Sequence, residues 1–177
     1  MIIEGKGAII PSPIVVPVLY KTVKRWEMIA QERYNRKYAE SRGQWQQGLD
    51  PEGIFKGIWG EGATHQWFLS YHLPSVWNPG ILPGGDDGID LAVGGIKIQA
   101  KTGEPLIRRI DDRGRKLPLV CTIYQFCRIV EDVAHIDGWV FREKLEELEK
   151  RGLEKGKGPW WNIRVPRTVF LPPLQLI

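Results

Sequence analysis

The feature that most constrains the fold is a pair of glycines, Gly94 and Gly95, between two short runs of alternating polarity. Residues 89–93 and 96–100 each alternate apolar and polar side chains, which is typical of half-buried β-strands. Two adjacent glycines supply the positive φ angles that a two-residue hairpin turn needs at both central positions. The sequence therefore predicts a β-hairpin with one apolar face against a core and one polar face.

Counting outward from the turn predicts which residues oppose each other across the hairpin. Val93 opposes Ile96, and further out Asp90 opposes Gln99. Lys101 projects from the same side, within diagonal reach of Asp90. A carboxylate and an amide oxygen suit Mg²⁺, and a lysine can hold a phosphate oxygen or orient a metal-bound water. The pattern favours a metal site for phosphodiester hydrolysis, and a surface hairpin with a polar outer face is the alternative.

The string GDDGIDLAVGGIKIQAK, within residues 84–101, resembles the catalytic core of the PD-(D/E)XK nuclease superfamily. In that core an Asp on one strand is followed on the next strand by (D/E)-x-K, and the Gln here is most similar to the Mrr type of restriction endonuclease. The resemblance implies an αβββαβ core, Mg²⁺ with Mn²⁺ as a substitute, and cleavage of DNA. It places Asp90, Gln99 and Lys101 at the metal and lysine positions. The sequence departs from the pattern in lacking Pro-Asp before the hairpin and in the neutral Gln99.

The family also places a glutamate on the helix before these strands, and Glu61 is its counterpart here. Glu61 lies among tryptophan and aliphatic residues, where an unpaired charge is costly, so a metal or lysine partner would explain it. An exposed helix charge is the alternative. His65, one helical turn later, is a candidate supporting residue or an ordinary core or surface histidine. Asp87 is a further candidate ligand or a residue suited to its turn.

Basic residues outnumber acidic ones in two segments of a chain with a formal net charge of +4. Residues 21–42 contain seven basic and three acidic side chains, and residues 97–128 contain eight and three. Either segment can follow a phosphate backbone, and an ordinary solvated surface is the alternative. The candidate DNA-binding residues are Lys24, Arg25, Lys97, Arg108, Arg109, Arg113, Arg115 and Lys116.

The whole pattern predicts an α/β (α+β) fold, with a mixed central sheet flanked by helices and an extra N-terminal helix. The apolar run 119–130 is predicted as a strand or left undecided, and 103–118 as an exposed loop or a two-stranded flap. Helices are expected over 20–42, 55–73 and 141–152, and a further strand over 134–140.

The length of 177 residues suits one domain. We expect an N-terminal extension with a basic helix over 1–50, a catalytic core over 51–151 and a closing segment over 152–177. Cys121 and Cys127 lie inside an apolar run and are expected to be buried free thiols in a reducing compartment. No long unbroken apolar stretch follows a charged leader, which argues against a signal peptide and a membrane span and for a cytoplasmic protein.

The leading hypothesis is a Mg²⁺-dependent endonuclease that acts on double-stranded DNA in a prokaryotic or phage-infected cell. One alternative is a DNA-binding protein of the same fold with little or no cleavage, which the neutral Gln99 keeps open. The other is a recombination nuclease for branched DNA such as Holliday junctions. A homodimer would provide two sites for two DNA strands.

Overall fold

Two long helices occupy the first part of the chain. The computed structural model describes residues 12–17, 20–40, 50–79, 88–110, 113–155 and 160–173. Helix α1 (Tyr20–Glu40) agrees with the predicted helix over 20–42. Helix α2 (Pro51–Ser70) begins before the predicted start at residue 55, because Asp50 accepts a hydrogen bond from the Glu52 N–H and proline suits the first helical position.

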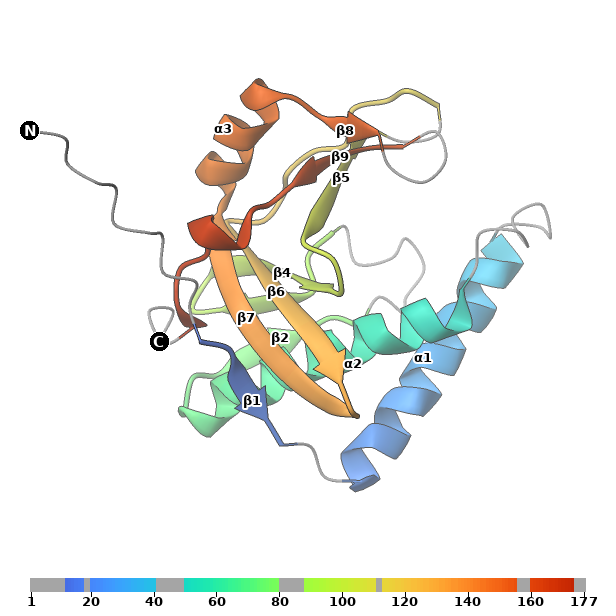
Figure 1. Cartoon of the computed structure of the whole chain (residues 1–177). Helices are drawn as coiled ribbons and strands as arrows, with labels where there is room; N and C mark the ends of the chain where they lie inside the picture. The colour runs from blue at the N-terminus through green and yellow to red at the C-terminus, as the bar shows by residue number, and fades with distance from the viewer. Residues whose placement is uncertain are drawn as a thin grey trace, which may run out of the picture.

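A six-stranded sheet lies at the centre of the molecule (Figure 1). Its strand order is β1-β7-β6-β4-β3-β2, and β4 and β6 are its parallel pair, whereas the other neighbours are antiparallel. The expected mixed α/β architecture is thus present as a curled mixed sheet with three helices. The strands are β1 (Ile14–Val16), β2 (Ser75–Trp77), β3 (Leu91–Val93), β4 (Ile96–Thr102), β6 (Ile123–Val130) and β7 (Val133–Phe141).

The predicted hairpin is formed by β3 and β4, and its register is confirmed near the turn. Val93 pairs with Ile96 and Leu91 pairs with Ile98, and both turn glycines have positive φ. The predicted pair between Asp90 and Gln99 is wrong, because the Asp90 N–H donates to the carbonyl of Ile98, 3.1 Å away. Asp90 and Leu91 therefore both lie opposite Ile98, which is a β-bulge, and a bulge re-aims the side chain that it carries.

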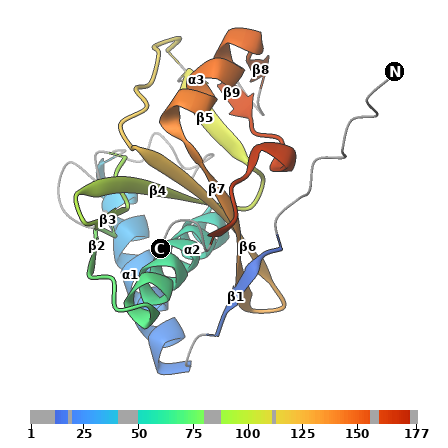
Figure 2. The same ribbon diagram turned by 90° about the vertical axis from the view of Figure 1, so that its left-hand side faces the viewer.

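A second, three-stranded sheet has the order β5-β9-β8. It contains β5 (Leu106–Ile110), β8 (Glu154–Lys155) and β9 (Trp161–Arg164), and it stands next to α3 (Arg142–Arg151). Part of the segment predicted as a loop or flap is thus a strand, but its partner β9 comes from the end of the chain. In Figure 2 this sheet and α3 lie at one end of the molecule, and α1 and α2 lie at the other.

Each face of the central sheet is covered by a separate hydrophobic cluster. Ile98, Ala100 and Ile123 face α2 and pack with the tryptophans of both long helices. Tyr124 and Phe126 face the opposite way, toward α3 and the second sheet. Because side chains alternate along a strand, residues 99 and 101 of β4 point to the face opposite α2.

The structure bears on two further predictions, one about the cysteines and one about a membrane span. Cys121 and Cys127 are buried free thiols, as expected. In the part of the chain that the structure describes, no helix has the length and apolar character needed to cross a membrane.

Candidate functional site

The bulge places the Asp90 carboxylate over the middle of β4. Asp90 is only 4% exposed, and its Oδ2 accepts a hydrogen bond from the Ala100 N–H at 2.8 Å. This N–H lies on the β3 side of β4, beyond Leu91, the first residue of β3, so the Asp90 side chain replaces the missing strand partner. An ionised carboxylate has about four lone-pair sites, so such a group can accept hydrogen bonds and bind a cation at the same time.

Gln99 and Lys101 flank this contact, because they are the residues on either side of Ala100. Both are half-buried. A Cβ added to Gly88 would lie 3.6 Å from Nε2 of Gln99, so the Gln99 amide lies beside the segment that leads into Asp90. The structure thus places the Asp90 carboxylate, just before the start of β3, on the Ala100 N–H between Gln99 and Lys101, and not in a direct cross-strand pair with Gln99.

The donor set at this point is suited to a hard cation with several water ligands. It offers the Asp90 carboxylate, the Gln99 amide oxygen and the Ala100 carbonyl, which points to the same side as the Ala100 N–H. Over the described residues, no three side chains of the His, Cys, Asp and Glu types come together as metal ligands. A Mg²⁺ ion here would depend on one buried carboxylate together with neutral oxygens.

Glu61 of α2 has an arginine partner. It is 4% exposed, and Oε1 accepts a hydrogen bond from Nη1 of Arg33 in α1 at 2.7 Å, while Oε2 accepts one from Nε1 of Trp77 at 3.2 Å. Arg33 thus supplies a positively charged partner for the buried Glu61 carboxylate, where a metal or a lysine was expected. Glu61 belongs to the helix that covers the other face of the sheet from Gln99 and Lys101, and its role as a metal ligand stays a prediction.

The negative charges of Glu61 and Asp90 both influence the buried thiol of Cys127. Burial raises the pKa of Cys127 to about 12, and the negative charges of Asp137, Glu61 and Asp90 act in the same direction. The hydrogen bond with Thr102 opposes them. Both candidate carboxylates therefore lie within electrostatic reach of one buried sulfur atom in β6.

The two candidate supporting residues have different outcomes. Nδ1 of His65 lies 2.6 Å from Oγ of Ser75, and its ring lies 5.9 Å from that of Trp77. Burial lowers the pKa of His65, and the positive charge of Arg25 lowers it further. His65 thus lies on the α2 side of the sheet with Glu61. Asp87 lies outside the described residues.

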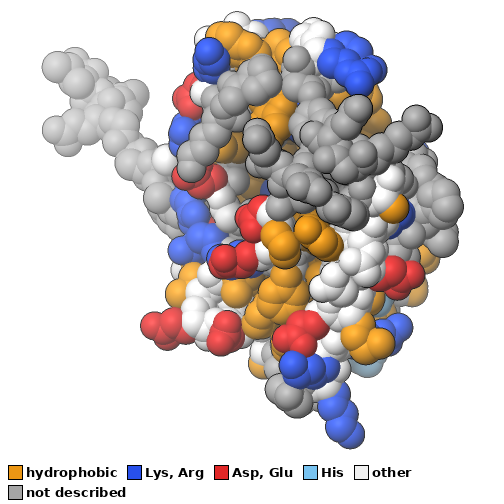
Figure 3. All heavy atoms as spheres, turned by 90° about the vertical axis from the view of Figure 1, so that its right-hand side faces the viewer, with side chains coloured by type: hydrophobic (Ala, Val, Ile, Leu, Met, Phe, Trp, Pro, Cys, Tyr) orange, Lys and Arg blue, Asp and Glu red, His pale blue; other side chains and the backbone are white. Residues whose placement is uncertain are grey.

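The candidate DNA-binding residues are distributed over several surfaces. Arg109 is 4% exposed and its guanidinium bonds to Glu149 and to the Leu117 carbonyl, so we leave it out of the DNA-binding set. Arg108 is exposed and lies 4.2 Å from the Trp160 ring centroid. On the face in Figure 3, basic and acidic side chains are interspersed around a group of hydrophobic ones. The exposed basic residues from the predicted set are Lys24, Arg25, Lys97, Arg108, Arg113, Arg115 and Lys116.

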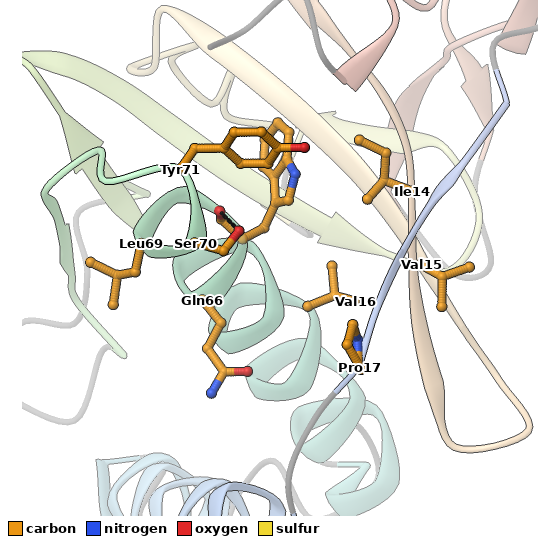
Figure 4. A pocket seen from close by; sticks show the side chains of 9 residues that line it. Ile14, Val15, Val16, Pro17, Gln66, Leu69, Ser70 and Tyr71 are labelled. Atoms are coloured by element: carbon orange, nitrogen blue, oxygen red, sulfur yellow. Dashed lines mark hydrogen bonds between the residues drawn. The ribbon is translucent and has the colours of Figure 1, made fainter.

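A hollow between β1 and the end of α2 has a different character. Figure 4 shows Ile14 and Val16 pointing toward α2 and Val15 pointing away. The lining contains no charged side chain. This hollow therefore does not suit a phosphate or a metal ion.

Arg33 is the residue of this region that the sequence analysis missed. It follows Trp26 and Ala30 at helical spacing, and all three lie on the side of α1 that faces α2. A cation within such an apolar stripe needs a buried anion as its partner. The position of Arg33 in the stripe was therefore a signal in the sequence for a buried ion pair.

Comparisons with known proteins identify no relative of this chain. A scan against models of protein families, a search of curated proteins and a search of solved structures each give no match. The function is therefore argued from the residues and their geometry.

Proposed function

We propose that this chain is a metal-dependent deoxyribonuclease of the PD-(D/E)XK type, in the variant with Gln before x-Lys. The observation that carries the proposal is the buried Asp90 carboxylate, which lies on the Ala100 N–H between Gln99 and Lys101. A buried carboxylate is costly unless it has partners, and a bound cation would stabilise this one further.

The order of the elements supports this assignment in part. Helix α2 is followed by the antiparallel strands β2, β3 and β4, as in the first half of an αβββαβ core. The parallel pairing of β4 with β6 also agrees with that core. The departure is the connection between β4 and β6, which contains β5 and no helix within residues 103–110 and 113–122.

Each residue has a defined task in this proposal. Asp90, the Gln99 amide and the Ala100 carbonyl would hold the ion, and a bound Mg²⁺ would lower the pKa of a water ligand and offset negative charge on the phosphate. Lys101 holds a non-bridging phosphate oxygen or orients the attacking water, as a compact positive charge. Glu61 positions Trp77 and Arg33 in the neighbouring wall.

The decisive experiment compares two lysines on one face of β4. With Mg²⁺ or Mn²⁺ and DNA that is supercoiled, linear, branched or single-stranded, Lys101→Ala should lower the cleavage rate by about 100-fold or more. Lys97→Ala, four residues away near the turn, should weaken DNA binding and leave the chemical step unchanged. Equal cleavage by the wild type and Lys101→Ala would contradict the assignment.

DNA binding with little or no cleavage is the second candidate. Two observations favour it: the one described carboxylate at the site is Asp90, and Glu61 is engaged by Arg33. If the wild type binds DNA but cuts none of the four substrates with either metal, this candidate replaces the nuclease. Faster cleavage of branched than of linear DNA would favour a recombination nuclease.

A further inference from the structure

A cavity of about 310 Å³ lies between α1, α2 and β2. We name it the α1–β2 groove, and its lining includes Lys21, Arg25, His65 and Trp77. Because β2 is the outermost strand of the central sheet, the groove borders the edge of that sheet. Its size is near the lower limit for small-ligand sites and suits a single nucleotide better than a larger ligand.

The charged residues of the groove are all basic. Lys21 and Arg25 are exposed and lie four residues apart on one face of α1, an arrangement of like charges that disfavours a helix. Within the residues described, neither forms an ion pair, and no acidic side chain lines the groove. Burial and the charge of Arg25 lower the pKa of His65, so that this ring is neutral at pH 7. An anion bound between Lys21 and Arg25 would relieve their repulsion.

The floor of the groove is aromatic and held in place. The Trp77 indole N–H donates to Glu61 at 3.2 Å, and the edge of Trp26 meets Trp77 with ring centroids 6.4 Å apart at 83°. The His65 ring lies 5.9 Å from Trp77 at an interplanar angle of 32°. A fixed aromatic surface next to two cations is the combination that binds a base and its phosphate in single-stranded nucleic acids.

The groove and the candidate metal site lie on opposite faces of the central sheet, and the backbone of β2 connects them at the sheet edge. Trp77 pairs with Leu91 across β2 and β3, and the N–H of Asn78 donates to the Asp90 carbonyl at 2.8 Å. A strand that passes the sheet edge at β2 can thus contact the groove close to Asp90.

We propose that the α1–β2 groove binds one nucleotide of a DNA strand, with its phosphate between Lys21 and Arg25 and its base against Trp77 and His65. The inference deepens the proposed function and rests on it for the identity of the strand as DNA. It explains why the indole of Trp77 is fixed by Glu61: the base then meets a surface that is already in place.

The test measures binding without cleavage. A dye-labelled single-stranded oligonucleotide is titrated with protein in EDTA, and the anisotropy gives the Kd. The double variant Lys21→Gln/Arg25→Gln should weaken binding by about 10-fold or more and reduce the salt slope by about 0.7 to 1.4, since one or two ionic contacts are lost. The matched control Lys150→Gln/Lys155→Gln removes the same charge from exposed positions on α3 and β8 and should change Kd less than about 2-fold.

Competition tests the aromatic half of the proposal on the wild type. A deoxynucleoside monophosphate should displace the oligonucleotide at concentrations where inorganic phosphate does not, because only the nucleotide has a base for Trp77. Equal competition by the two, or equal weakening by the groove variant and its control, would overturn the inference. If the wild type cuts no DNA but its binding depends on the groove, the nuclease proposal is wrong and the groove proposal stands. If the wild type cuts DNA but the groove variant binds as well as the wild type, the groove proposal is wrong and the nuclease proposal stands.

Discussion

Replacing Glu61 by glutamine separates a structural role of this residue from a purely catalytic one. The Glu61 and Arg33 side chains are 6% and 11% exposed, and their charged atoms are 2.7 Å apart. Glutamine removes the negative charge and leaves a buried guanidinium with a weaker partner, which costs about 3 kcal/mol. For a chain of this size, that loss lowers Tm by about 6–12 °C. The measurement is thermal and urea unfolding in EDTA, so that metal binding makes no contribution.

The chain offers a matched control on α1, the helix that carries Arg33. Lys24 and Glu27 also approach to 2.7 Å, but their side chains are 54% and 43% exposed. Because water screens such a pair, Glu27→Gln should cost less than about 1 kcal/mol. If Glu61→Gln in EDTA is as stable as Glu27→Gln, the argument from burial fails, and Glu61 is then better explained as a metal ligand. Adding Arg33→Met to Glu61→Gln should recover part of the lost stability, because the buried charge is then gone.

Three further outcomes follow from burial and packing. Gly62→Ala should destabilise by about 1–3 kcal/mol in urea unfolding, because its Cβ would lie 2.4 Å from the Trp26 indole, whereas Gly57→Ala on the same helix meets nothing and should be neutral or stabilising. Burial raises the pKa of Glu149, but hydrogen bonds and charge from basic neighbours outweigh it and leave the pKa below its usual value of 4.5. Its stabilisation is therefore complete above about pH 4.5 and lost as pH falls below that value, so the wild type should lose more stability than Glu149→Gln in acid unfolding curves; equal losses would contradict this. Burial raises the pKa of Cys127 to about 12, so an aromatic disulfide reagent at pH 8 should modify this thiol only after unfolding, and rapid modification of the native protein would refute its placement.

The hairpin was predictable because its information is local. Gly94 and Gly95 supply the turn, and the alternation beside them sets the register as far as Leu91. The bulge at Asp90 was not predictable in this way. There the Asp90 carbonyl accepts a hydrogen bond from the N–H of Asn78, the residue after β2, and this strand lies outside the local hairpin pattern.

The turn between β6 and β7 escaped prediction for a different reason. Glu131 and Asp132 both have positive φ, at 48° and 59°, where glycine or asparagine is the usual signal. The sequence therefore showed that residues 119–130 form an apolar run. It did not show that this run pairs as a hairpin with the following strand. The pairing is instead maintained by the long ladder from Ile123 to Val130 and its burial on both faces.

The second sheet has a consequence for the order of folding. Arg108 of β5 pairs with Asn162 of β9, so this sheet closes a large loop, whereas β3 with β4 and β6 with β7 join neighbours in the chain. Closing a large loop costs more chain entropy than zipping a hairpin, so the β5–β9 pairing should form after these two hairpins and open before them. In hydrogen exchange, amides of β5 and β9 should thus exchange before those of β6, and each such opening would uncover the side of β6 that carries Tyr124 and Phe126.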